Sequence, residues 1–474
     1  MLSSLSVPFA SLVRGRGAVR PAAAALVSGL VAVGVLAAAG QAVADGTTPG
    51  QGGAIATIGG LKTYGDAVIH GEEGDQQVSA GLFGMSVDGG GMLQTYCVDL
   101  YNPTQKDAKY RETPWSGTSL GANKDAGRIR WILENSYPQV NDLAELARKA
   151  GIGAEFTEQD AAAGTQVAIW RYSDAADVDA VDPQAEKLAD YLYKNAGSAA
   201  EPSASLTLDP PAVSGRQGEL LGPVTVRTDA DSVAVAPPAD AATTGVRIVD
   251  EDGEDVNTAK NGTELFFKVP SGAADGTAEL TVHASTTVPV GRAFASEGRS
   301  QTQILAGSSE STVTATASAA WAETGSVPAL SAAENCAEGG VDITAANRGD
   351  EPFTFELLGT EHSIPADTTR TVTIPLQEDQ AYDFTITGPG GLEKRFTGVL
   401  DCLTETSTMT AGESTQILSE PSPATVGGTS EELNLAATGS SGATPLIGGV
   451  AIGLVIIGGT ALILVRNKKS PTND

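Results

Sequence analysis

Short runs of alternating apolar and polar residues fill most of the chain between residues 203 and 403, and they constrain its fold more than any other feature. Successive side chains of a strand point to opposite faces of a sheet, so this alternation is typical of half-buried β-strands. Gly, Pro, Asp and Asn separate the runs, as they do at turns. The pattern predicts two antiparallel, immunoglobulin-like β-sandwich domains, over residues 203–322 and 330–403.

Residues 45–202 have a different pattern, in which strand-like runs are followed by helical spacing, and this pattern predicts a mixed α/β domain. Two strand-like segments come first, QVSAGLFGMSV and MLQTYCVDLYN, and the DGGG between them is typical of a hairpin turn. Four helices are expected after this hairpin. The first two cover residues 123–135 and 140–150, the third begins at a capping box formed by Thr157 and Asp160, and the fourth runs from Asp182-Pro183 to Gly197.

The first 44 residues read as a secretory signal peptide. Basic residues precede an apolar stretch, and Ala42-Val43-Ala44 is a small-residue cleavage site. Near the other end, residues 445–465 form an apolar run of 21 residues, long enough to cross a bilayer as a helix. The basic tail at 466–474 would stay in the cytoplasm. The apolar run and this tail, taken alone, predict a single-pass membrane protein.

A pentapeptide, Leu435-Ala436-Ala437-Thr438-Gly439, lies just before the apolar run. The order of pentapeptide, apolar span and basic tail resembles the cell-wall sorting signal of Gram-positive bacteria, in its LAxTG variant. The resemblance implies that a sortase, class E-like, cleaves between Thr438 and Gly439 and joins Thr438 to peptidoglycan. The protein would then span the membrane before sorting and be anchored covalently to the wall afterwards. Residues 404–434, rich in Thr, Ser, Glu and Pro, predict a flexible wall linker.

The charge of the chain supports an extracellular surface and excludes some partners. It has 29 Lys and Arg residues against 58 Asp and Glu residues, and the expected leader holds three of the arginines and no acid. The mature protein is therefore more acidic than the whole chain. Such a charge argues against binding to nucleic acid or to anionic lipid.

Three cysteines are present, and a secreted protein with an odd number needs an explanation for the one left over. Cys336 and Cys402 flank the predicted last sandwich, so we expect a disulfide between them. Cys97 then remains. It can be a buried structural thiol, a link to another chain, a catalytic nucleophile, or a sulfur bonded to something other than sulfur.

A cysteine hydrolase would need a base beside Cys97. His70 is the only one of the three histidines in the same predicted domain, and Val98-Asp99 after the cysteine matches no local signature of a cysteine protease. This hypothesis is therefore the weakest of the alternatives.

Two motifs favour the last explanation for Cys97. The segment Tyr96-Cys97-Val98-Asp99 and the later run TQVAIW, residues 165–170, resemble the thioester domain of Gram-positive surface adhesins. That family has a hydrophobic-Cys-hydrophobic segment and a TQxA helix in this order. The resemblance implies a thioester between Cys97 and Gln166, formed with loss of ammonia, within an environment that includes Tyr96, Asp99, Thr165 and Trp170.

The function that this resemblance implies is covalent adhesion. An amine on a partner, expected to be a lysine, attacks the acyl carbon, Cys97 leaves as a thiol, and an amide remains. The reaction happens once, so we expect no enzyme in the usual sense, no cofactor and no metal site. The alternative is a wall-anchored stalk that binds its ligand non-covalently and keeps Cys97 buried.

Overall fold

The computed structural model describes residues 52–403, apart from residues 72–73, 154 and 297. These residues belong to the first of two compact units, Met1–Ser422, whereas all of the second, Pro423–Asp474, lies outside the described part. Within the described residues, no helix combines the length and the apolar character needed to cross a membrane.

Several expectations fall on residues outside the described part and stay predictions. They are the leader at 1–44, the linker at 404–434, the pentapeptide at 435–439, the apolar run at 445–465 and the basic tail at 466–474.

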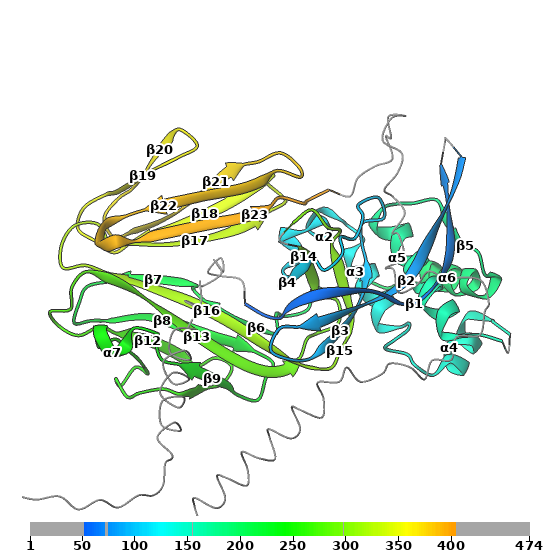
Figure 1. The fold of residues 1–474 in the computed structure, drawn as a ribbon, viewed down its shortest axis with the longest axis horizontal. Coiled ribbons are helices and arrows are strands. Elements are labelled where there is room, and N and C mark those ends of the chain that lie inside the picture. The colour runs from blue at the N-terminus through cyan, green and yellow to red at the C-terminus, as the bar shows by residue number, and fades with distance from the viewer. Residues whose placement is uncertain (1–51, 72–73, 154, 297, 404–474) are drawn as a thin grey trace, which may run out of the picture. The chain divides into compact units, whose positions relative to one another are not determined.

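A closed antiparallel β-barrel forms the first part of the described chain (Figure 1). Its sheet has seven strands in the order β2-β3-β15-β14-β4-β1-β5, and β1 also pairs with β2, so the order returns to its start. The long strand β1 makes this possible, because Ala56 pairs with Val87 of β2 on one side and with Tyr110 of β4 on the other. The strands are β1 Ile55–Gly71, β2 Gly74–Val87, β3 Met92–Cys97, β4 Lys109–Thr113, β5 Val178–Ala180, β14 Ala293–Ser296 and β15 Gln303–Ser308.

Two of these strands come from a distant part of the chain. The sequence placed residues 293–308 within the sandwich expected at 203–322, but β14 and β15 lie in the barrel, between β4 and β3. They follow β13 (Gly276–Thr287) and precede β16 (Glu310–Trp321), which pair with each other along their whole length. The chain therefore leaves the second region, adds two strands to the barrel and returns, because hydrogen bonding to β3 and β4 closes an otherwise open sheet.

Helix α5 packs against strands β1 and β2 of the barrel, and the expected capping box starts this helix. Thr157 and Asp160 bond reciprocally to each other's backbone N–H, as the motif predicts, and α5 runs from there for 16 residues. Gly164 lets α6 approach closely, since a Cβ there would lie 2.4 Å from the Ala185 carbonyl oxygen. The helices are α2 Ser119–Ala122, α3 Ala126–Glu134, α4 Leu143–Ala150, α5 Glu158–Ser173 and α6 Pro183–Asn195, with a short 3-10 turn at Trp115–Gly117.

The second region contains two sheets whose buried side chains belong to one hydrophobic cluster, which also includes residues of the barrel. One sheet has the order β11-β9-β13-β16-β7 and the other has the order β10-β12-β8-β6. The expected sandwich is not antiparallel throughout, because β16 pairs in parallel with β7. The elements not yet given are β6 Leu206–Asp209, β7 Ala212–Gly215, β8 Leu220–Thr228, β9 Val233–Ala236, α7 Ala241–Thr244, β10 Arg247–Val249, β11 Thr258–Ala259 and β12 Glu264–Lys268.

The last described region has its own hydrophobic cluster, which includes Val341, Ile343 and Phe396. A three-stranded sheet, β17-β18-β21, accompanies two hairpins, β19-β20 and β22-β23. Cys336 and Cys402 form a disulfide here, with their Cα atoms 5.1 Å apart. The strands are β17 Pro328–Asn335, β18 Gly340–Asn347, β19 Phe353–Leu357, β20 Thr360–Ile364, β21 Thr368–Pro375, β22 Ala381–Thr387 and β23 Glu393–Val399, with a 3-10 turn at Pro389–Gly391.

Candidate functional site around Cys97

Cys97 lies at the end of β3, where its side chain is 3% exposed. Strand β2 pairs with β3 only as far as Thr95, so the ladder on that side stops before Cys97. The side chain of Gln166 continues it. Its Oε1 accepts from the Cys97 backbone N–H at 3.1 Å, and its Nε2 donates to the Cys97 carbonyl oxygen at 2.9 Å. Gln166 thus replaces a missing strand and satisfies both main-chain polar groups of Cys97.

Three successive turns of α5 hold the end of β3. Gln166, Trp170 and Asp174 are four residues apart and share one face of the helix, with Asp174 as its C-cap. Trp170 Nε1 donates to Cys97 Sγ at 2.9 Å, and Asp174 Oδ1 accepts from the Leu100 backbone N–H at 3.0 Å. The helix therefore contacts the backbone of Cys97, its sulfur and the turn that follows it.

A second glutamine lies directly opposite Cys97. Gln303, the first residue of β15, pairs with Cys97 in the ladder between β15 and β3, and the Val98 N–H donates to the Thr302 carbonyl at 3.1 Å. That bond marks Cys97 and Gln303 as a non-hydrogen-bonded pair, the kind whose side chains are closest. Both side chains extend from the same face of the sheet.

The two ends of the Gln303 side-chain amide differ, because its oxygen accepts a hydrogen bond and its nitrogen makes none with any residue that the structure describes. Thr95 Oγ1 donates to Gln303 Oε1 at 2.9 Å, and both residues are fully buried. In the part of the chain that the structure describes, Gln303 Nε2 has no hydrogen-bond partner. A buried amide nitrogen without a partner destabilises a folded protein, so its presence needs an explanation.

Sequence reasoning missed Gln303 because the run TQILA was assigned to the sandwich expected at residues 203–322. The signal that could have revealed it is a glutamine directly before three apolar residues, Ile304, Leu305 and Ala306. Glutamine is seldom placed in such a strand without a specific role.

Burial controls the titration of this site. Desolvation raises the pKa of the Cys97 thiol well above its usual value, and the nearby Asp174 charge adds to this, while the Trp170 hydrogen bond opposes it. Burial also raises the pKa of Asp174 to about 7, although hydrogen bonds from Ser173 and Leu100 oppose the shift. A free Cys97 is therefore a neutral thiol at neutral pH and a poor nucleophile toward a substrate from solution.

The remaining residues of the predicted environment are buried but differ in what they contact. Tyr96 points to the other face of β3 from Cys97, and its hydroxyl donates to the Tyr137 carbonyl at 2.9 Å. Thr165 donates to the Ala161 carbonyl within α5 at 2.7 Å. Asp99 is 1% exposed and lies two residues beyond Cys97. Of the predicted aromatic neighbours, Trp170 is the one that contacts the sulfur.

His70 is engaged elsewhere. Its Nδ1 lies 2.9 Å from Asp75 Oδ1, and its Nε2 lies 3.3 Å from Asp179 Oδ2. The hydrogen bond with Asp75 is the main reason that the pKa of His70 is raised. Both ring nitrogens thus contact carboxylates rather than a thiol, which removes the base that the hydrolase hypothesis needs.

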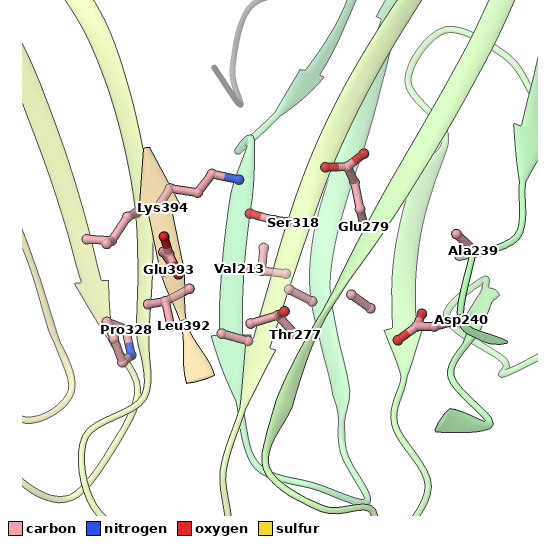
Figure 2. Close-up of a pocket in the computed structure, with 15 residues that line it drawn as sticks. Val213, Ala239, Asp240, Thr277, Glu279, Ser318, Pro328, Leu392, Glu393 and Lys394 are labelled. Carbon is pink, nitrogen blue, oxygen red and sulfur yellow. The ribbon is translucent and has the colours of Figure 1, made fainter. Parts of the chain in front are cut away.

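A cavity of about 280 Å³ lies away from this site (Figure 2). Residues of β7, β13, β16, β17 and β23 line it, and Figure 2 shows Glu279, Ser318 and Lys394 among them. Burial lowers the pKa of Lys394, whereas the Glu279 charge opposes that shift. None of the residues that contact Cys97 lines this cavity.

Two segments of the chain match known protein families. Residues 322–399 match a family model described as the bacterial phospholipase C, C-terminal domain. No curated protein matches the chain.

Two solved structures are similar to much of the chain at low identity. The Bacillus anthracis TIE protein is 15% identical, with a TM-score of 0.26, over 74% of this chain and 81% of that one. The thioester domain of the Enterococcus faecium TIE86 protein is 19% identical, with a TM-score of 0.27, over 59% of this chain and 99% of that one. The family model of the thioester domain matches residues 94–198, the segment that contains Cys97 and the TQVAIW helix.

Proposed function

We propose that the barrel and its helices hold an internal thioester, formed when the Cys97 thiol condenses with a glutamine side chain. The observation that carries this proposal is the pairing of two buried residues, Cys97 and Gln303, across β3 and β15. The thioester domain match over residues 94–198 supports it.

Two glutamines compete for the role of acyl donor, and we favour Gln303 over the expected Gln166. Both ends of the Gln166 amide are hydrogen-bonded to the Cys97 backbone, and losing its nitrogen would break the bond to the Cys97 carbonyl. Loss of Gln303 Nε2 as ammonia would instead remove a buried donor that has no partner among the described residues. Condensation at Gln303 therefore breaks no hydrogen bond, and it removes a buried donor whose lack of a partner in the described chain destabilises the fold.

Gln166 then acts as a positioning residue. By holding the N–H and the C=O of Cys97, it fixes the backbone of Cys97, and with it the direction of the Cα–Cβ bond, beyond the end of the β2 ladder. Holding two reacting groups in place is how an intramolecular reaction proceeds without an external enzyme.

The thioester would work as a single-use hook. A lysine amine of a partner attacks the Gln303 acyl carbon, the C–S bond breaks, Cys97 leaves as a thiol and an amide bond remains. Burial of the site excludes water and so protects the bond from hydrolysis until a partner docks. Sortase attachment of Thr438 to peptidoglycan would display this hook on the wall of a Gram-positive cell.

A non-covalent stalk is the second candidate, in which Cys97 stays a buried thiol outside the disulfide. The mass of the purified protein decides between the two. A thioester lowers the intact mass by one ammonia beyond the effect of the disulfide, and Cys97→Ala restores it.

Methylamine identifies the acyl donor. Methylamine opens a thioester and leaves an N-methyl amide on the glutamine that formed it, so peptide mapping shows which residue carries the label. We expect the label on Gln303, and none in Cys97→Ala. A label on Gln166 would restore the expectation from sequence, and a wild-type protein without mass deficit or label would leave the stalk as the function.

A further inference from the structure

The hydroxyl of Thr95 is placed to act on the carbonyl that reacts. Thr95 Oγ1 donates to Gln303 Oε1 at 2.9 Å, so it contacts the oxygen whose charge changes when the acyl carbon is attacked. Thr95 and Gln303 are both 0% exposed. A hydrogen bond in such a dry site is stronger than in water, because solvent neither competes with it nor screens it.

The geometry of β3 puts the hydroxyl and the sulfur on the same side. Thr95 and Cys97 are two residues apart in one strand, so their side chains share a face. Gln303 lies across from Cys97 on β15, and its side chain reaches diagonally to Thr95. Its amide group is thus hydrogen-bonded on the oxygen side and lies opposite the strand that carries the nucleophile.

We propose that Thr95 is a catalytic residue of both thioester formation and amine capture, with its hydroxyl as the oxyanion donor. This inference rests on the proposed function, with Gln303 as the acyl donor. The Thr95 hydroxyl polarises the carbonyl and so makes the acyl carbon more electrophilic. The same hydrogen bond strengthens as negative charge collects on Oε1 in the tetrahedral intermediate.

The steps balance without any other reactant. In formation, Cys97 Sγ bonds to Gln303 Cδ, the Cδ–Nε2 bond breaks, and the thiol proton leaves with Nε2 as ammonia. In capture, the amine nitrogen bonds to Cδ, the Cδ–Sγ bond breaks, and one amine proton ends on the sulfur. Both steps pass through an intermediate with a negative oxygen at the position of Oε1, which is the atom that Thr95 contacts.

A pair of substitutions at Thr95 separates the hydroxyl from the shape of the side chain. Thr95→Val removes the hydroxyl and keeps the branched outline, whereas Thr95→Ser keeps the hydroxyl. The measurements are the rate of methylamine incorporation at Gln303 and the fraction of protein that carries the thioester, each in the whole protein at fixed pH. Thermal melting shows whether each variant is folded, and Thr95→Ala replaces the valine variant if that one does not fold.

We expect methylamine to open Thr95→Val roughly a hundred- to a thousandfold more slowly than wild type, the effect of removing one oxyanion donor. Thr95→Ser should recover most of the wild-type rate. A purely structural role would lower the melting temperature without this recovery by serine. If folded Thr95→Val forms and opens the thioester at the wild-type rate, the role of Thr95 is overturned while the thioester stands. A wild-type protein without a mass deficit, or with the label on Gln166, overturns the proposed function or its acyl donor instead.

Discussion

Arg292 and Glu112 form a buried ion pair at the point where the returning chain joins the barrel. Arg292 Nε donates to Glu112 Oε1 at 2.9 Å, and the two side chains are 4% and 0% exposed. The same carboxylate accepts from the backbone N–H groups of Ala54 and Ser205. Glu112 lies in β4 and Arg292 directly precedes β14, so the pair fixes the strands that bring Gln303 to Cys97.

The first prediction concerns this pair. Glu112→Gln keeps the size of the side chain but removes one of the two carboxylates that contact the buried Arg292 guanidinium; the other, Glu201, remains 2.8 Å from Arg292 Nη1. Breaking a buried ion pair typically lowers the free energy of unfolding by about 3–5 kcal/mol, and we expect the low end of that range here because Glu201 still balances part of the charge. Urea unfolding measures it. We also expect a smaller fraction of molecules to form the thioester, because β15 is held less firmly beside β3.

The matched control is an exposed ion pair in the last region, Asp383 with Arg395, whose side chains are 56% and 62% exposed. Asp383→Asn should leave both the urea midpoint and the thioester fraction nearly unchanged, since solvent screens exposed charges. Equal effects from the two substitutions would mean that the buried pair has no special role in joining β14 to the barrel.

Local features of this fold were predictable from the sequence, and distant pairings were not. The Thr157–Asp160 capping box predicts the start of α5, because its two hydrogen bonds depend on residues three apart. Alternation predicts that residues around 303–308 form a strand, but it does not say which strand lies beside it. The barrel closes through β15 and β14 after more than a hundred intervening residues, so Gln303 could not be placed opposite Cys97 from the sequence.

The TQVAIW motif led to the right helix but, under our proposal, to a different role for its glutamine. A motif gives residue types and their order, and it predicted that Gln166 would lie beside Cys97, which it does. Which atom of Cys97 the amide contacts depends on where the β2 ladder ends, and that is a property of the folded barrel.

The second prediction concerns the sulfur as a leaving group. Trp170 Nε1 donates to Cys97 Sγ, so it should stabilise the negative charge that the sulfur gains when an amine displaces it. Trp170→Phe keeps most of the ring and loses that donor, which should slow methylamine capture about ten- to a hundredfold, the typical effect of a hydrogen bond to a charged group.

Trp115→Phe is the control for this change. Trp115 Nε1 donates to the Gly291 carbonyl at 2.9 Å, so the substitution also removes a buried indole hydrogen bond, but one that does not reach the sulfur. The capture rate should then stay close to that of wild type. Similar slowing in both variants would show that loss of stability, and not the contact with sulfur, controls the rate.

The third prediction is a pH dependence of stability. Burial raises the pKa of Asp174 to about 7, whereas an unfolded aspartate titrates near pH 3.9. Between about pH 4 and pH 7 the folded protein holds a proton that the unfolded chain has released, so the contribution of Asp174 to the free energy of unfolding falls as the pH rises. Asp174→Asn removes this contribution, and urea unfolding at several pH values should show a shallower decline than in wild type.

Glu334 gives a comparison for Asp174, because burial raises the pKa of its carboxyl to about 7 as well. Glu334→Gln should flatten the same pH interval without altering methylamine capture, since Glu334 bonds to Tyr382 in the last region. An unchanged decline in Asp174→Asn would show that this carboxyl ionises normally in the folded protein.

The fourth prediction tests whether the thioester domain can exist without the strands that return to it. A chain of residues 45–202 contains Cys97, Gln166 and α5 but lacks β14 and β15, so β3 and β4 would each keep an unpaired edge. We expect this fragment to aggregate or to lack stable structure by circular dichroism, and to show no mass deficit.

Residues 45–322 include both strands and the sandwich that carries them, so this longer chain should fold, form the thioester and take up methylamine at Gln303. The two fragments together decide between the glutamines: a folded 45–202 fragment with the mass of a thioester would have to use Gln166, and the pairing of Cys97 with Gln303 would then serve only to close the barrel.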